Sequence, residues 1–126
     1  MIAVRTHQRT RHLHKHYNLE FLKDYYGNDV SSMQIILKLY LQETPKDIAT
    51  IGEHLHSNNV FSAKEATHKM KANVAMLGIT DPAEFITAMH FLAVTDDVNQ
   101  EILLKFSAFR IEVLAAMQEI KADYFS

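Results

Sequence analysis

The sequence contains no cysteine and few residues that break helices. Its 126 residues include three glycines and two prolines, and 48% are hydrophobic. The absence of cysteine excludes a disulfide framework and a thiolate metal site. The scarcity of glycine and proline favours an all-helical fold. A chain of this length fits one domain and can bury a sizeable core.

Long apolar runs and glycine-rich loops are also missing. No apolar stretch approaches the roughly 20 residues of a membrane-spanning helix, and residues 1–4 are too short for the apolar region of a signal peptide. We therefore expect a cytoplasmic protein without a membrane partner. The three glycines are isolated, so no loop of the usual kind can hold the phosphates of ATP. This argues against a kinase.

Charge is divided unevenly along the chain. Residues 1–16 hold four basic and no acidic side chains, whereas residues 17–126 hold nine basic and fifteen acidic ones, a net charge of −6. Half of the eight histidines lie in the first segment: His7, His12, His14 and His16. No carboxylate or thiol there completes a metal site, so we expect a solvated, mobile extension over residues 1–16. The acidic remainder opposes nucleic-acid binding.

The apolar spacing predicts a short helix followed by longer amphipathic ones. The short helix is expected over residues 19–26 and is ended by Gly27. The next helix begins at Asn28 or Asp29. Pro45 either separates two helices or kinks a single one, and the apolar spacing that continues beyond it favours a single kinked helix.

Three further segments complete the predicted fold. The first is capped by Asn58 or Asn59, or begins with a capping box at Ser62, and it ends at Gly78. The second begins at Asp81–Pro82, and the last is expected to be capped within residues 95–97. Four amphipathic helices with short connections predict an antiparallel four-helix bundle with the short helix as an accessory.

One histidine on the second of these longer helices faces away from the predicted core. With Met70 taken as the core direction, the 100° helical step places His68 about 160° away. Ala72 and Ala75 leave its carboxyl-terminal side uncovered, and Phe61 adds an exposed aromatic ring to the same strip. This mixture of small and apolar residues around a histidine is typical of a protein-docking surface.

Two lysines flank this histidine. Lys64 and Lys71, at positions i−4 and i+3, lie within reach of an anion attached to the ring of His68. A neutral imidazole is a nucleophile near pH 7. The alternative is an ordinary surface histidine with two lysines nearby by chance.

The surrounding residues match a known signature. They read Ala66-Thr67-His68-Lys69-Met70-Lys71-Ala72, followed by Leu77-Gly78. This resembles the signature of histidine-containing phosphotransfer (HPt) domains: alanine, any residue, histidine, any residue, leucine, lysine and glycine, then a leucine–glycine pair. The resemblance extends from about Tyr17 to Ala122, so residues 17–126 are expected to form an HPt-like domain.

The resemblance implies roles for individual residues. His68 corresponds to the phosphorylated histidine and Lys71 to its supporting lysine, while Lys64 is expected to share the charge balance. Ala72 replaces the family's glycine, and His90 stands where relatives often carry glutamine or glutamate. Phe61, Ala72, Ala75 and His90 are the expected docking residues.

By this resemblance the protein is a phosphocarrier and not an enzyme. His68 would accept a phosphoryl group from a receiver-domain aspartate of a two-component phosphorelay and pass it to another. The implied partners are response-regulator receiver domains and a sensor (hybrid) histidine kinase. No cofactor is expected in this chain, because the receiver would supply Mg²⁺. We also expect a monomer.

Two other functions are compatible with these residues. A degenerate HPt-like module could bind a receiver without phosphotransfer, which Ala72 and His90 keep open. A helical metal protein or enzyme could use His68 with His90, but two histidines without nearby carboxylates fall short of a bundle metal site.

Overall fold

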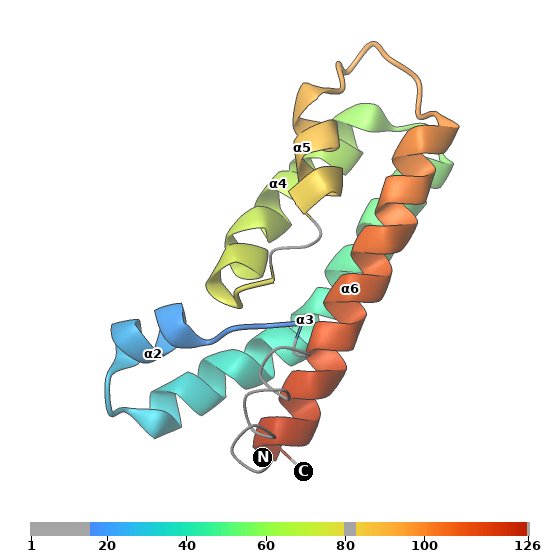
Figure 1. The fold of residues 1–126 in the computed structure, drawn as a ribbon. Helices are drawn as coiled ribbons and strands as arrows, with labels where there is room; N and C mark the ends of the chain where they lie inside the picture. The colour runs from blue at the N-terminus through green and yellow to red at the C-terminus, as the bar shows by residue number, and fades with distance from the viewer. Residues whose placement is uncertain (1–15, 80–82, 126) are drawn as a thin grey trace, which may run out of the picture.

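The computed structural model describes residues 16–79 and 83–125, and this part of the chain is an all-α bundle (Figure 1). Its helices are α2 (Glu20–Tyr26), α3 (Val30–His56), α4 (Val60–Met76), α5 (Ala83–Phe91) and α6 (Gln100–Phe125). Contacts join α3 to α4, α4 to α5, α5 to α6 and α6 to α3, which closes a ring of four helices. Consecutive helices of this ring run in opposite directions. The predicted all-α bundle is confirmed.

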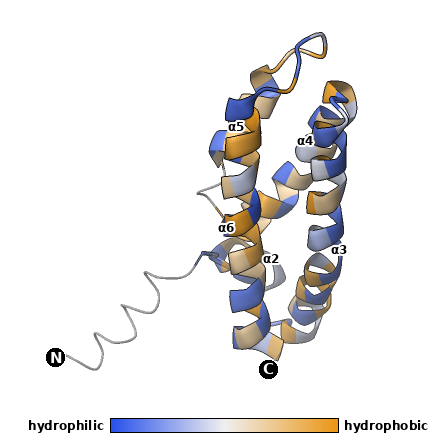
Figure 2. Cartoon of the chain, turned by 90° about the vertical axis from the view of Figure 1, so that its right-hand side faces the viewer, coloured by the Kyte–Doolittle hydropathy of each residue, from blue (hydrophilic) through white to orange (hydrophobic). Residues whose placement is uncertain are grey.

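The core lies where the apolar stripes of these helices meet. Hydrophobic and hydrophilic residues alternate along each helix, as the helical repeat requires (Figure 2). Within the core, the ring centroid of Phe85 lies 5.4 Å from that of Phe106 and 4.9 Å from that of Phe109. Helix α4 contributes Met70, which is 1% exposed. The burial of Met70 confirms the core direction from which the face of His68 was predicted.

Local capping residues fix where α3 and α4 begin. The side chain of Asp29 accepts a hydrogen bond from the Ser32 backbone N–H at 3.0 Å, and Asn59 accepts one from the Ser62 N–H at 3.2 Å. Hydrogen bonds from Ser32 also hold the pKa of the Asp29 carboxyl below its usual range. Helix α3 continues through Pro45, so the single-helix prediction is confirmed.

The carboxyl end of α4 depends on a glycine. Gly78 has φ +65°, and a Cβ at this position would lie 2.3 Å from the backbone oxygen of Asn18. The Asn18 N–H donates to the Leu77 carbonyl at 2.9 Å. The segment before α2 therefore packs directly on the turn that ends α4. Helix α2 packs on α3 and buries Leu22 in the common core, which fits its predicted accessory role.

The predicted start of the last helix is wrong. No side chain of residues 95–97 caps α6, because it is Asn99 that accepts the backbone N–H of Ile102, at 2.9 Å. Asp97 instead accepts a hydrogen bond from the side-chain amide of Asn58 at 3.0 Å. The side chain of Asp97 is therefore directed at the α3–α4 turn and not at the start of α6. The predicted start at Asp81–Pro82 lies outside the described residues.

The segment that leads into α2 is attached to α6. The His16 backbone N–H donates to a carboxylate oxygen of Glu119 at 2.6 Å, and its Nδ1 lies 2.5 Å from the other oxygen. The Tyr17 hydroxyl donates to Asp123 at 2.5 Å, and burial together with this bond raises the pKa of Tyr17. The other residues of the predicted extension, 1–15, lie outside the described part. None of the described helices combines the length and apolar character needed to cross a membrane.

Candidate functional site

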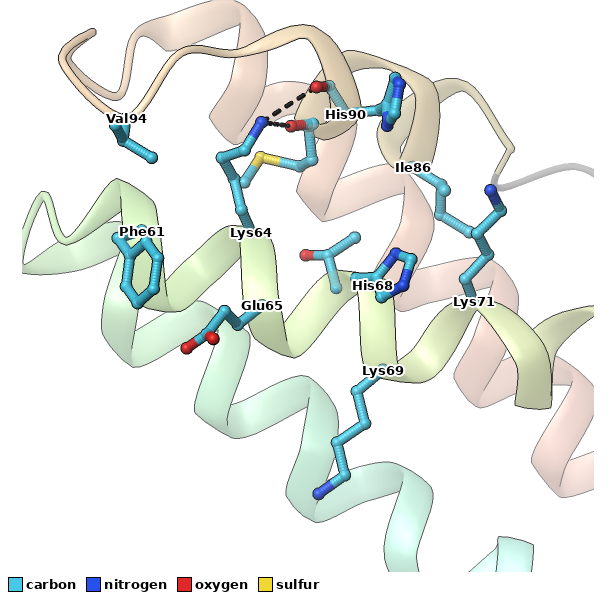
Figure 3. A pocket seen from close by; sticks show the side chains of 11 residues that line it. Phe61, Lys64, Glu65, His68, Lys69, Lys71, Ile86, His90 and Val94 are labelled. Carbon is cyan, nitrogen blue, oxygen red and sulfur yellow. Dashed lines mark hydrogen bonds between the residues drawn. The ribbon is translucent and has the colours of Figure 1, made fainter.

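A groove between α4 and α5 contains most of the predicted site. It has a volume of about 530 Å³, and His68 lines it together with Phe61, Lys64, Lys71 and His90 (Figure 3). We call this cavity the His68 groove. Phe61, Lys64, His68 and Lys71 come from α4 and His90 comes from α5. The fold thus brings a residue of α5 to the helix face that carries the predicted phosphoacceptor.

The His68 side chain is exposed, whereas Thr67 beside it and Val74 further along α4 are buried. Val74 is 5% exposed, and Thr67 is 2% exposed. The Thr67 hydroxyl donates to the Ala63 carbonyl at 2.8 Å, so this buried polar group is satisfied within α4. No described residue forms a hydrogen bond to the His68 ring. An accessible imidazole nitrogen of this kind can act as a nucleophile.

The lysines around His68 point in different directions. Lys71 extends toward α5, whereas Lys69 points toward α3 (Figure 3). On α3, burial raises the pKa of the Asp47 carboxyl, and the charge of Lys69 acts in the opposite sense. Lys71 forms no salt bridge with any carboxylate in the described part of the chain. Its ammonium group is therefore available to an anion in the groove.

The ammonium group of Lys64 has several partners already. It donates to the carbonyls of Met89 and His90, each at 2.9 Å (Figure 3). It also donates to the carbonyl of Leu92. All three carbonyls lie at the carboxyl end of α5 or just beyond it. Lys64 thus lies one helical turn from His68, as predicted, but its charge is directed at the backbone of α5.

A second groove adjoins the first along the same two helices. It has a volume of about 440 Å³, and it shares Lys71 and His90 with the His68 groove. Ala75 lines this second groove, while Ala72 is exposed on α4 without lining either cavity. Phe91, which is 78% exposed, also lines it. The surface available for docking therefore extends beyond His68 toward the turn at the end of α4.

The contributions of α5 and the loop after it were largely missed by the sequence reasoning. Ile86, Met89 and Val94 line the His68 groove, and Ile86 also lines the second groove. Met89 is 1% exposed. The spacing of Ile86, Met89 and His90 at i, i+3 and i+4 places them on one helix face. In the sequence, that spacing is the feature that indicates a common wall formed by these three residues.

The described residues do not form a metal site. No three histidine, aspartate or glutamate side chains among residues 16–79 and 83–125 come together as metal ligands. His68, His90 and Glu65 line the same groove, but these three side chains do not come together as a metal-binding group. The geometry instead offers the exposed imidazoles of His68 and His90, the ammonium group of Lys71 and an apolar wall from α5.

Comparison with known proteins identifies a signalling relative. The chain is 24% identical over 107 residues to the Sensor protein EvgS of Escherichia coli strain K12, and to the same extent to the Sensor protein EvgS of Escherichia coli O157:H7. Each match covers 85% of this chain but only 9% of the relative. No protein-family model and no solved structure matches the chain. The similarity is therefore to a small part of a much longer sensor protein.

Proposed function

We propose that this chain is a histidine phosphotransfer domain of a two-component phosphorelay. His68 would accept a phosphoryl group from a receiver-domain aspartate and pass it to another, while a sensor histidine kinase supplies the phosphoryl group upstream. The observation that carries the proposal is the exposed His68 in a groove that also holds the unpaired Lys71. Similarity to a sensor protein over 85% of the chain supports this signalling context.

The proposed chemistry needs little from the chain beyond one nucleophile and one charge. The unprotonated ring nitrogen of His68 attacks phosphorus, and an N–P bond forms as the bond to the aspartate oxygen breaks. The aspartate carboxylate is regenerated, and the proton on the other ring nitrogen can leave to water. Lys71 balances charge on the transferring group, which is the main requirement of phosphoryl transfer. The partner would contribute its aspartate and Mg²⁺.

The proposal assigns partner docking to the exposed side chains around His68. Phe61 lies on one side of the histidine, and Ala75 and His90 line the surface on the other side. The small side chain of Ala72 allows the receiver backbone to approach, with one methyl group more than the family's glycine. The proposal also retains the expected cytoplasmic location and monomeric state.

Transfer from purified phosphorylated receiver domains tests this proposal. We expect acid-labile label on the wild-type chain and none on His68→Gln. His56→Gln is the control, because it removes an exposed imidazole that lines neither groove and should still be labelled. Circular dichroism of each variant verifies the helical fold. Label that persists on His68→Gln would overturn the assignment.

The same experiment distinguishes phosphotransfer from the second candidate function, which is receiver binding without transfer. Ala72 lies exposed on the docking face of α4, where the family carries glycine. A degenerate module would bind a receiver through this face but would acquire no label. Binding without transfer for every receiver tested would therefore favour the degenerate module.

A further inference from the structure

The side chain of Lys64 caps the carboxyl end of α5. Carbonyl groups at the end of a helix lack intrahelical partners and carry the negative end of the helix dipole. The ammonium group of Lys64 donates to three such carbonyls, those of Met89, His90 and Leu92. An ammonium group has three N–H donors, so these bonds use its full capacity. Lys64 is also half-buried, which fits a structural contact better than a surface charge.

This contact joins the two walls of the His68 groove. Lys64 precedes His68 by one turn on α4, and the carbonyls belong to the end of α5 that carries His90. A second contact joins the segment after α5 to the turn before α4. Asn58, two residues before α4, accepts the Val98 N–H at 2.8 Å. Val94, which lines the groove, lies on the segment between these two contacts.

We propose that Lys64 is a positioning residue, which holds α5 against α4 and thereby sets the docking wall formed by His90 and Val94. It would not act on the phosphoryl group, and that charge would be balanced by Lys71. This inference rests on the proposed phosphotransfer function for its effect on docking. The contact between Lys64 and α5 does not depend on that function.

Two matched substitutions distinguish the proposed role of Lys64 from that of Lys71. Lys64→Met and Lys71→Met each keep an unbranched side chain and remove its charge. Transfer is measured from a phosphorylated receiver over a range of concentrations, which gives a maximal rate and a half-saturating concentration. Backbone hydrogen exchange of residues 86–98 is measured on the same proteins without a partner. Lys38→Met serves as the control, because Lys38 is exposed on α3 outside both grooves.

The two variants are expected to change different quantities. Lys64→Met should speed exchange at the end of α5 and in the following segment by about tenfold, since charged hydrogen bonds are lost. Its half-saturating concentration should rise roughly threefold to tenfold, while the maximal rate stays within about twofold. Lys71→Met should lower the maximal rate by about tenfold or more and leave exchange unchanged.

Opposite results would overturn the inference. If Lys64→Met lowers the maximal rate as Lys71→Met does and leaves exchange unchanged, then Lys64 acts on the phosphoryl group. Unchanged exchange together with unchanged docking would also reject a positioning role. If the wild type accepts no phosphoryl group, the phosphotransfer function fails, and faster exchange in Lys64→Met would still establish the contact between α4 and α5.

Discussion

The two faces of α4 differ in what surrounds them. On one face, Ala63, Met70 and Val74 are at most 5% exposed and pack into the bundle core. On the other face, His68 and Lys71 are exposed and line a groove. Side chains on the buried face must fit the space within the core, whereas those on the exposed face must supply the groups that react or bind. Both sets lie within the 17 residues of α4. Substitutions on the buried face of α4 should therefore change stability, and substitutions on its exposed face should change function.

The largest stability change is expected from the buried face. Met70→Ala removes most of a side chain that is 1% exposed, which should lower the free energy of unfolding by about 2–5 kcal/mol. Urea denaturation followed by circular dichroism measures this change. At a temperature where the variant stays folded, the His68 groove should still support transfer. A loss below about 1 kcal/mol would show that Met70 is not a core residue.

A smaller loss of stability is expected when the turn that ends α4 is altered. Gly78→Ala should destabilise the protein because the added Cβ would meet Asn18 and because φ is +65°. Gly27→Ala is the matched control, since φ there is +59° but no atom lies within 4 Å of an added Cβ. Each variant places an alanine at a positive φ, which costs about 1–3 kcal/mol. Only Gly78→Ala adds the close contact with Asn18, so it should lose more stability than Gly27→Ala. Equal losses in thermal or urea unfolding would contradict the close contact with Asn18.

The smallest changes, in receiver binding and in stability, are expected from a substitution on the exposed face of α4. Ala72→Gly restores the family's glycine beside His68 and should tighten receiver binding by less than about tenfold. The same change should cost about 0.5–1 kcal/mol of stability, because glycine is unfavourable within a helix. Binding measured by calorimetry and unfolding measured by urea test the two effects together. Weaker binding by Ala72→Gly would show that the alanine methyl group contributes to docking.

Features that depend on neighbouring residues were predictable from the sequence. Asp29 and Gly78 act within one turn of the helix ends they define, so their residue types indicated those ends. The face of His68 followed from the helical repeat and a correctly chosen core direction at Met70. Continuity of α3 through Pro45 followed from apolar spacing that persists beyond the proline.

Features that depend on distant contacts were not predictable. Asp97 appeared able to cap α6, but its side chain bonds with Asn58, which is 39 residues away. The carbonyl partners of Lys64 lie 25 to 28 residues further along the chain, so helical spacing placed the lysine correctly without revealing its contact. Likewise, nothing local indicated that His16 contacts Glu119 across 103 residues.

The location of the phosphoryl group after transfer tests the central claim most directly. We would label the chain from a phosphorylated receiver, digest it under alkaline conditions, and identify the modified residue by mass spectrometry. The account predicts acid-labile label on His68 alone. Label on His90 or on another histidine, with His68 unmodified, would contradict it.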